Sequence, residues 1–124
     1  MDAVYPDPFA VEPAPDLSSV GALIDELQRQ ASLLTAVATG GPRIEHVQWE
    51  YQERRQRLID ALQRRGLEHP FPWQDLWQWY GEWTRNLATY AARRAAISEL
   101  VGPTIDALQR QRSGLTVTDR GPGP

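Results

Sequence analysis

The sequence predicts an all-α protein, built as an antiparallel helical hairpin followed by a third long helix that is kinked near Gly102-Pro103. Two observations indicate this three- or four-helix bundle. Apolar residues recur at three- and four-residue steps over most of the chain, which is the spacing of one helix face. Gly40-Gly41-Pro42 interrupts the first such pattern, and the proline-containing stretch 68–72 interrupts the second.

The first helix is expected over about 17–39, with Asp16 or Ser18 as its N-cap. Its apolar stripe consists of Val20, Leu23, Ile24, Leu27, Ala31, Leu34 and Ala38. Glycine can adopt the left-handed conformation that ends a helix, and proline suits the first turn of the next one. Because Gly40-Gly41-Pro42 is short, the second helix is expected to return antiparallel to the first.

The second helix is expected over about 43–65, where apolar residues again form one stripe. The stripe consists of Ile44, Val47, Tyr51, Leu58 and Leu62. Gly66 ends this helix, and 68–72 should be an extended link because each proline disfavours helix in the residue before it. Pro72 suits the first turn of the third helix, and the carboxylate of Asp75 suits that helix's positive N-terminal end.

The third helical pattern continues to Leu100. Gly102-Pro103 predicts a break or kink there, followed by a last short helix over about 104–112. The helical domain should therefore cover 17–112, and the final segment, 113–124, should be disordered.

The N-terminal segment 1–16 is expected to be an acidic, proline-rich, disordered tail. It contains four acidic residues and four prolines but no basic residue. The predicted domain, 17–112, has 12 arginines against 11 acidic residues, and the 124-residue chain has a net charge of −3. A nearly neutral domain gives no bulk electrostatic reason to bind nucleic acid or an anionic membrane.

Composition excludes several kinds of chemistry. The chain has no cysteine, so it cannot form disulfides, thiolate nucleophiles or cysteine-ligated metal centres. All 13 basic residues are arginine, so lysine Schiff bases and a phosphate-loop lysine are also excluded. No apolar run is long enough to span a membrane. The N-terminus does not resemble a signal peptide, and a cytoplasmic location is expected.

Residues 70–83 contain four of the five tryptophans. A helical wheel places Leu76, Trp79, Tyr80, Trp83, Leu87, Tyr90, Ile97 and Val101 on an ordinary core stripe of about 100°. Trp73 and Trp77 widen the apolar arc to about 160°, which two helices cannot easily cover. The predicted partner-binding residues are Trp49, Phe71, Trp73 and Trp77, because exposed tryptophans dominate binding energy when they fill a partner's pocket. The alternative is that the link 70–72, or the acidic tail, covers Trp73 and Trp77.

Three pairs of adjacent arginines suggest a second kind of surface, because arginine beside aromatic residues is a feature of nucleic-acid binding. The pairs are Arg54/Arg55, Arg64/Arg65 and Arg93/Arg94. Arg54, Arg55, Arg93 and Arg94 are the candidate contacts to an anion or nucleic acid. The wheel places Arg94 on the apolar face, where it would need a carboxylate partner or would bind an anion in a pocket. It places Arg93 on the solvated outer face.

No catalytic residues, metal site or cofactor are expected. His46 and His69 are the only histidines, and His46 with Glu50 lacks an evident third metal ligand. His69 is expected to be a loop residue. The chain has no Ser-His-Asp spacing, glycine-rich phosphate loop or HExxH motif.

These observations favour a non-catalytic interaction module that binds another protein or a second copy of itself through its aromatic-rich helix face. A nucleic-acid-associated regulator that uses the paired arginines is one alternative. Another is a small-molecule site between the helices, lined by tryptophans, in which Arg94 holds an anionic group.

Overall fold

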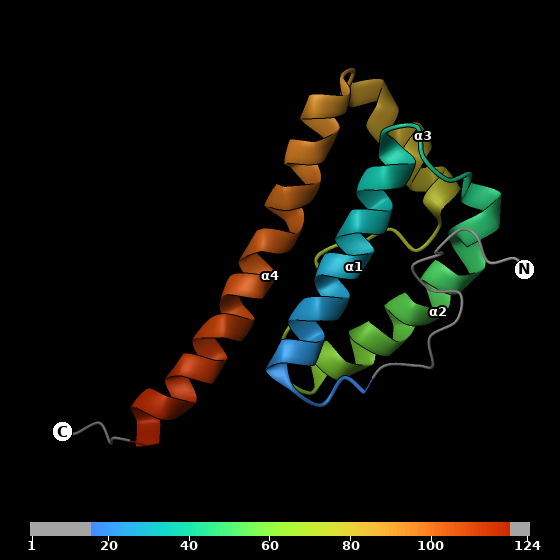
Figure 1. The fold of residues 1–124 in the computed structure, drawn as a ribbon. Coiled ribbons are helices and arrows are strands. Elements are labelled where there is room, and N and C mark those ends of the chain that lie inside the picture. Colours follow the sequence, from blue (N-terminus) through green and yellow to red (C-terminus); the bar gives the residue numbers. More distant parts are fainter. Residues whose placement is uncertain (1–15, 120–124) are drawn as a thin grey trace, which may run out of the picture.

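The described part of the chain folds into four helices, which confirms the all-α prediction. The computed structural model describes the backbone of residues 16–119 and the side chains of 16–112. The helices are α1 (Val20–Ala38), α2 (Ile44–Gln63), α3 (Leu76–Asn86) and α4 (Tyr90–Asp119), and no strand occurs in the described part. α1 lies between α2 and α4, and the shorter α3 lies near the end of the bundle where α1 ends and α4 begins (Figure 1). Our predictions for 1–15 and 120–124 concern residues outside this description.

The α1–α2 hairpin forms at the predicted turn. Gly40 adopts a φ of 88°, the left-handed conformation expected of it. A side chain at Gly41 would bring its Cβ within 2.6 Å of the Ala36 carbonyl oxygen, so only glycine fits there. The N-cap of α1 was predicted as Asp16 or Ser18, but it is Ser19, whose side chain accepts a hydrogen bond from the backbone N–H of Ala22.

The third predicted helix is in fact two helices. α3 begins at Leu76, four residues later than Pro72 suggested, because the side chain of Asp75 caps it by accepting from the Trp77 N–H. The chain then leaves the helix over 87–89, and Thr89 starts α4 by accepting a hydrogen bond from the Ala92 N–H.

α4 passes through Gly102-Pro103 without ending there. Pro103 lies inside the helix and is exposed, so its ring is on the solvent side. The backbone of α4 continues to Asp119, which includes part of the segment 113–124 that we expected to be disordered.

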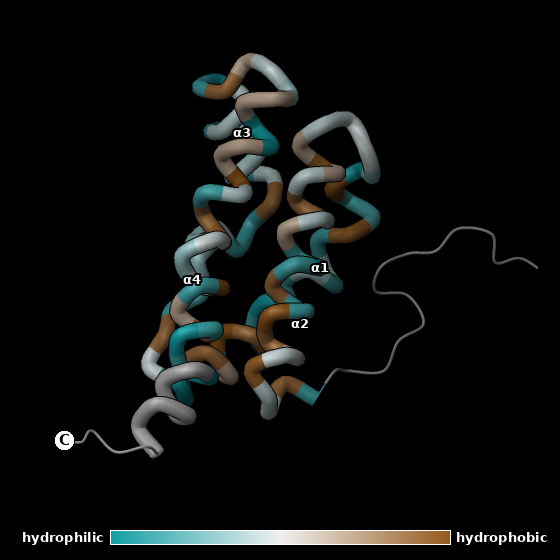
Figure 2. The backbone as a smooth tube through the Cα atoms, turned by 60° about the vertical axis from the view of Figure 1, so that its left-hand side comes forward, coloured by the Kyte–Doolittle hydropathy of each residue, from teal (hydrophilic) through white to brown (hydrophobic). Residues whose placement is uncertain are grey.

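The apolar residues form two clusters along the bundle. Hydrophobic residues occur at short intervals along α1 and α2 (Figure 2). The first cluster joins the end of α1, the start of α2, the α2–α3 link, α3 and α4; it includes Leu34, Val37, Tyr51, Phe71, Trp79 and Ile97. The second joins the start of α1, the end of α2 and α4; it includes Leu23, Leu27, Leu58, Leu62 and Leu108.

Two glycine substitutions are expected to have opposite effects on stability. Gly81 lies inside α3, and a Cβ there would meet no atom within 4 Å apart from its chain neighbours and the helix's own backbone. Glycine inside a helix costs about 1 kcal/mol relative to alanine, so Gly81→Ala should raise the free energy of unfolding by about that amount. Gly66 also has open space but has a φ of +77°, so Gly66→Ala should lower it. Urea denaturation measures both, and equal effects of the two variants would contradict the α3 helix at Gly81.

Candidate functional site

Two of the five tryptophans are mostly exposed, and both lie where α2 meets α3. The exposed fraction is 68% for Trp49 and 54% for Trp77. The junction is held by Gln48, whose Oε1 accepts a hydrogen bond from the Leu76 N–H at 2.6 Å, and by Gln52, whose amide donates to the Gln74 carbonyl. Trp49 follows Gln48 and Trp77 follows Leu76 in sequence. We call these two side chains the Trp49/Trp77 surface.

Phe71 was predicted to bind a partner, but only 1% of its surface is exposed and its side chain belongs to the core. Its ring packs against those of Tyr51, Trp73, Trp79 and Trp83, with ring centroids 5.1–6.3 Å apart. The link between α2 and α3 therefore contributes a residue to the core as well as joining the two helices.

Trp73 is partly buried, so it too offers less surface than predicted. Its ring packs against those of Phe71, at a centroid distance of 5.1 Å, and Trp83, at 6.1 Å. Its indole Nε1 donates to Glu82 at 2.9 Å. One alternative was that the link 70–72 covers both Trp73 and Trp77. Phe71 of the link does pack on Trp73, whereas Trp77 is exposed.

Two residues of the predicted core stripe behave differently in the structure. Trp79 is fully buried, as predicted, while Tyr90 is 50% exposed. Ile97 and Val101, which the same wheel placed on this stripe, are buried. Tyr90 lies seven residues before Ile97, on the same face of α4, but it is the first residue of that helix and lies at the end of the bundle. Its prediction as a core residue was wrong for this reason.

The structure exchanges the predicted positions of two arginines. Arg94 is exposed and Arg93 is buried, the reverse of the prediction. The Arg93 guanidinium donates to the carbonyl of Ala38 at 3.0 Å and to that of Leu87 at 2.8 Å. It thereby ties the end of α1 to the α3–α4 link.

Neither Arg54 nor Arg55 is free to form a basic surface. Arg55 donates twice to the Phe71 carbonyl, at 2.9 and 3.2 Å, and so fixes the link. Arg54 is buried and forms a two-point ion pair with Glu26 on α1, at 2.6 and 3.0 Å.

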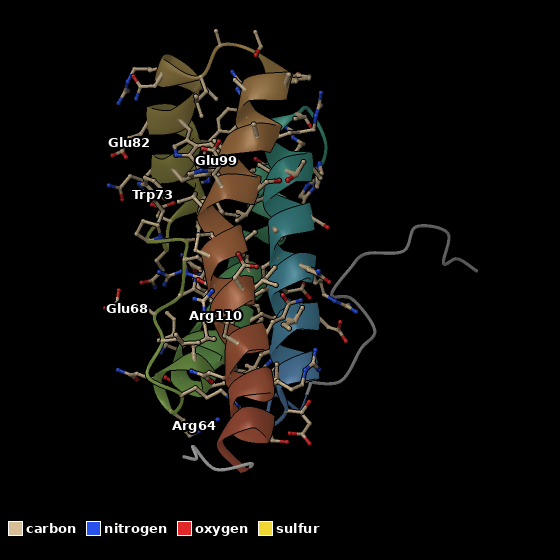
Figure 3. The ribbon with its side chains drawn as sticks, turned by 90° about the vertical axis from the view of Figure 1, so that its left-hand side faces the viewer. Arg64, Glu68, Trp73, Glu82, Glu99 and Arg110 are labelled. Atoms are coloured by element: carbon tan, nitrogen blue, oxygen red, sulfur yellow. The ribbon has the colours of Figure 1, made fainter. Side chains whose placement is uncertain are left out.

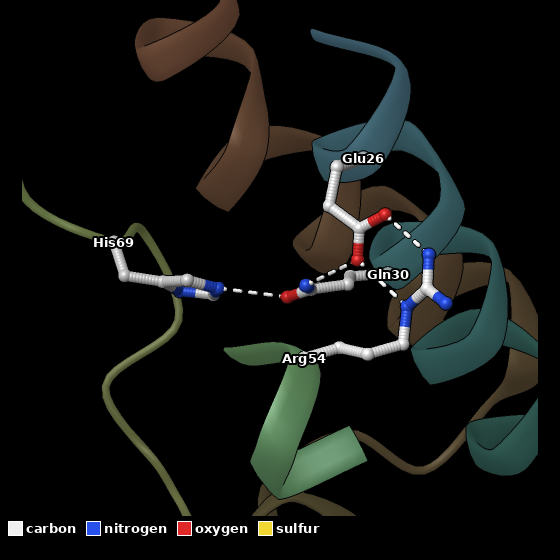
Figure 4. A network of polar contacts seen from close by, with 4 residues as sticks. All are labelled: Glu26, Gln30, Arg54 and His69. Atoms are coloured by element: carbon white, nitrogen blue, oxygen red, sulfur yellow. Dashed lines mark hydrogen bonds and ion pairs between the residues drawn. The ribbon is translucent and has the colours of Figure 1, made fainter. Parts of the chain in front are cut away.

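A buried chain of polar side chains extends from this ion pair (Figure 4). The amide of Gln30 donates to Glu26 at 2.9 Å, and its oxygen lies 2.9 Å from Nε2 of His69. His69 Nδ1 in turn accepts from the Phe71 N–H, so Nε2 is the nitrogen that carries the proton. We call Glu26, Gln30, Arg54 and His69 the polar network.

Burial lowers the pKa of His69 to about 4, and the positive charge of Arg55 contributes to the same shift. His69 is therefore neutral at pH 7, which matches its bond to the Phe71 N–H. Sequence reasoning assigned His69 to a loop and missed the network. The available signal was Gln30, a polar residue at a helical step from Leu27 and Leu34, inside an apolar stripe.

Comparison with known protein families, curated proteins and solved structures found no match.

The polar network has the geometry of a structural element. The carboxylate of Glu26 is already held by Arg54 and Gln30, and both ring nitrogens of His69 have partners. Within the described residues, no three histidine or acidic side chains gather as a metal site would require. No helix in that part of the chain is long and apolar enough to cross a membrane.

Proposed function

We propose that this chain is a non-catalytic protein-binding module that contacts another protein, or a second copy of itself, through the Trp49/Trp77 surface. The observation that supports this is the exposure of two tryptophans at one helix junction, while Trp73, Trp79 and Trp83 are buried or partly buried. A tryptophan is among the residues that contribute most to a protein interface when it is covered.

The residues around the two indoles suit a reversible contact. Glu45 and Glu53 of α2 are exposed near Trp49 in sequence, and Asp75 is exposed near Trp77. Apolar anchors surrounded by charged residues are the usual composition of such an interface, with a desolvated centre and a polar rim.

The nucleic-acid alternative has lost its main support. Adjacent residues on a helix point about 100° apart, so each arginine pair divides between two faces. Arg54, Arg55 and Arg93 make internal bonds to Glu26, Phe71 and the Ala38 and Leu87 carbonyls.

The double substitution Trp49→Gln/Trp77→Gln is expected to abolish partner binding and to leave the melting temperature within about 3 °C of wild type, since both side chains are mostly exposed. Binding is measured by affinity purification from the native lysate, and self-association by sedimentation velocity over a range of concentrations. Tyr90→Gln is the matched control, because it removes an exposed aromatic side chain at the α3–α4 end of the bundle.

A partner or dimer that is lost with the double substitution and kept with Tyr90→Gln supports the proposal. It is wrong if the partner or dimer persists in the double variant. It is also wrong if the double variant unfolds, since the two tryptophans would then belong to the core.

A further inference from the structure

A cleft of about 510 Å³ lies between α3 and α4, apart from the Trp49/Trp77 surface. It is lined by Trp73, Trp83 and Asn86 on one side and by Ala96, Glu99 and Leu100 of α4 on the other. Figure 3 shows Trp73, Glu82 and Glu99 on the same side of the molecule.

The aromatic walls of this cleft are held in place. The rings of Trp73 and Trp83 meet edge to face, with centroids 6.1 Å apart and planes at 80°. Trp73 is fixed by Phe71 on one side and by the hydrogen bond from its Nε1 to Glu82, and Trp83 packs on Trp79 at 5.5 Å. Two fixed indoles at such an angle form a corner that needs no rearrangement to receive a ligand.

The charge at the cleft is negative. Glu99 is the one ionisable residue among those lining it. Its neighbours on the helix surface, three and four residues away, are alanines, Gly102 and Pro103, none of which can pair with it. Among the described residues the Glu99 carboxylate makes no ion pair or hydrogen bond with another side chain. Glu82, which holds Trp73, adds a second carboxylate nearby.

We propose that this cleft binds an organic cation, an alkylammonium or guanidinium group, between the Trp73 and Trp83 rings and the Glu99 carboxylate. An aromatic face attracts a cation within about 6 Å of its centre, and methyl groups on the cation add apolar contact with the indoles. The sequence suggested an anionic ligand held by Arg94. Arg94 does not line the cleft and Glu99 does, so the ligand proposed here is a cation.

The test uses two cations and a neutral control. Choline represents a free quaternary ammonium ion, N-acetylargininamide represents an arginine side chain of a partner protein, and 3,3-dimethyl-1-butanol has the shape of choline without its charge. Binding to the full chain is followed by the indole N–H signals of the five tryptophans in ¹H–¹⁵N NMR. Choline or N-acetylargininamide is expected to shift the Trp73 and Trp83 signals, and the neutral alcohol to bind about tenfold more weakly.

Glu99→Gln is expected to weaken binding of the cation about fivefold, the effect of one partly solvated charge. Asp106→Asn is the matched control, because it removes the same charge from the same face of α4 two turns away and should change the affinity less than twofold. Both acidic residues are exposed, so neither variant should affect folding.

Tighter binding of choline would indicate a free ligand and tighter binding of N-acetylargininamide a protein side chain; both support a cation site. The proposal is overturned if neither cation shifts Trp73 and Trp83, if the neutral alcohol binds equally well, or if Asp106→Asn weakens binding as much as Glu99→Gln. Shifts confined to Trp49 and Trp77 would also overturn it, while leaving the Trp49/Trp77 surface supported.

Discussion

Replacing Arg54 with methionine is expected to lower the free energy of unfolding by about 3–5 kcal/mol. Methionine is unbranched and apolar and replaces the aliphatic stem of arginine but not its guanidinium, so most of the loss is expected to come from the charge left on Glu26. The Glu26 carboxylate is only 3% exposed and would keep the Gln30 amide as a hydrogen-bond donor but lose its counter-ion. A buried charge that loses its counter-ion is among the most costly changes that a protein can undergo.

Two further variants test whether the effect comes from the buried ion pair. Arg57→Met removes an arginine from an exposed pair with Glu53, one turn away on the same helix, and should change stability by less than about 1 kcal/mol. The double variant Glu26→Met/Arg54→Met should recover most of the loss, because apolar residues of similar volume can replace a buried pair.

Urea denaturation at pH 7 compares the four proteins. A single variant Arg54→Met that is no less stable than Arg57→Met would show that Glu26 and Arg54 are solvated in the folded protein. A double variant as unstable as the single one would show that packing, and not charge, is what Arg54 contributes.

The hairpin could be predicted because its turn is made by residues with strong backbone preferences. Gly40-Gly41-Pro42 favours few structures other than a turn between two helices. The apolar residues on either side of it each follow a single helical spacing. The break at 87–89 could not be found in the same way, since this stretch contains neither glycine nor proline. Its local signal was Thr89, a modest N-cap residue that also occurs inside helices.

The missed break bears on Arg93, because the Leu87 carbonyl that its guanidinium binds lies in the break. Tyr90 was misplaced for a different reason, since it lies on the face of α4 that carries Ile97 but at the end of the bundle. The errors at Phe71 and in the polar network have another origin, because they depend on contacts between residues far apart in the chain. His69 and Gln30 are 39 residues apart, and helical spacing carries no information about such a pair.

Acidification from pH 6.5 to pH 4 is expected to destabilise the protein through His69 by about 3 kcal/mol, because its pKa is lowered from 6.5 to about 4 in the folded state. The lowered pKa means that the unfolded chain binds the proton more tightly. The stabilising contribution is therefore complete above pH 6.5 and is lost as the pH falls toward 4. The proton would enter at Nδ1, which accepts from the Phe71 N–H, and it would add a charge facing Arg55 of α2.

His69→Asn isolates this contribution from that of the other groups of the protein. Asparagine can still accept the Phe71 N–H bond through its side-chain oxygen, but it does not titrate. Between pH 6.5 and pH 4, urea denaturation should therefore show a loss of stability about 3 kcal/mol smaller for His69→Asn than for wild type. His46→Asn, which changes the exposed histidine of α2, is the matched control for the substitution itself. Parallel curves for wild type and His69→Asn would mean that His69 is solvated and that the link 68–72 opens before the bundle unfolds.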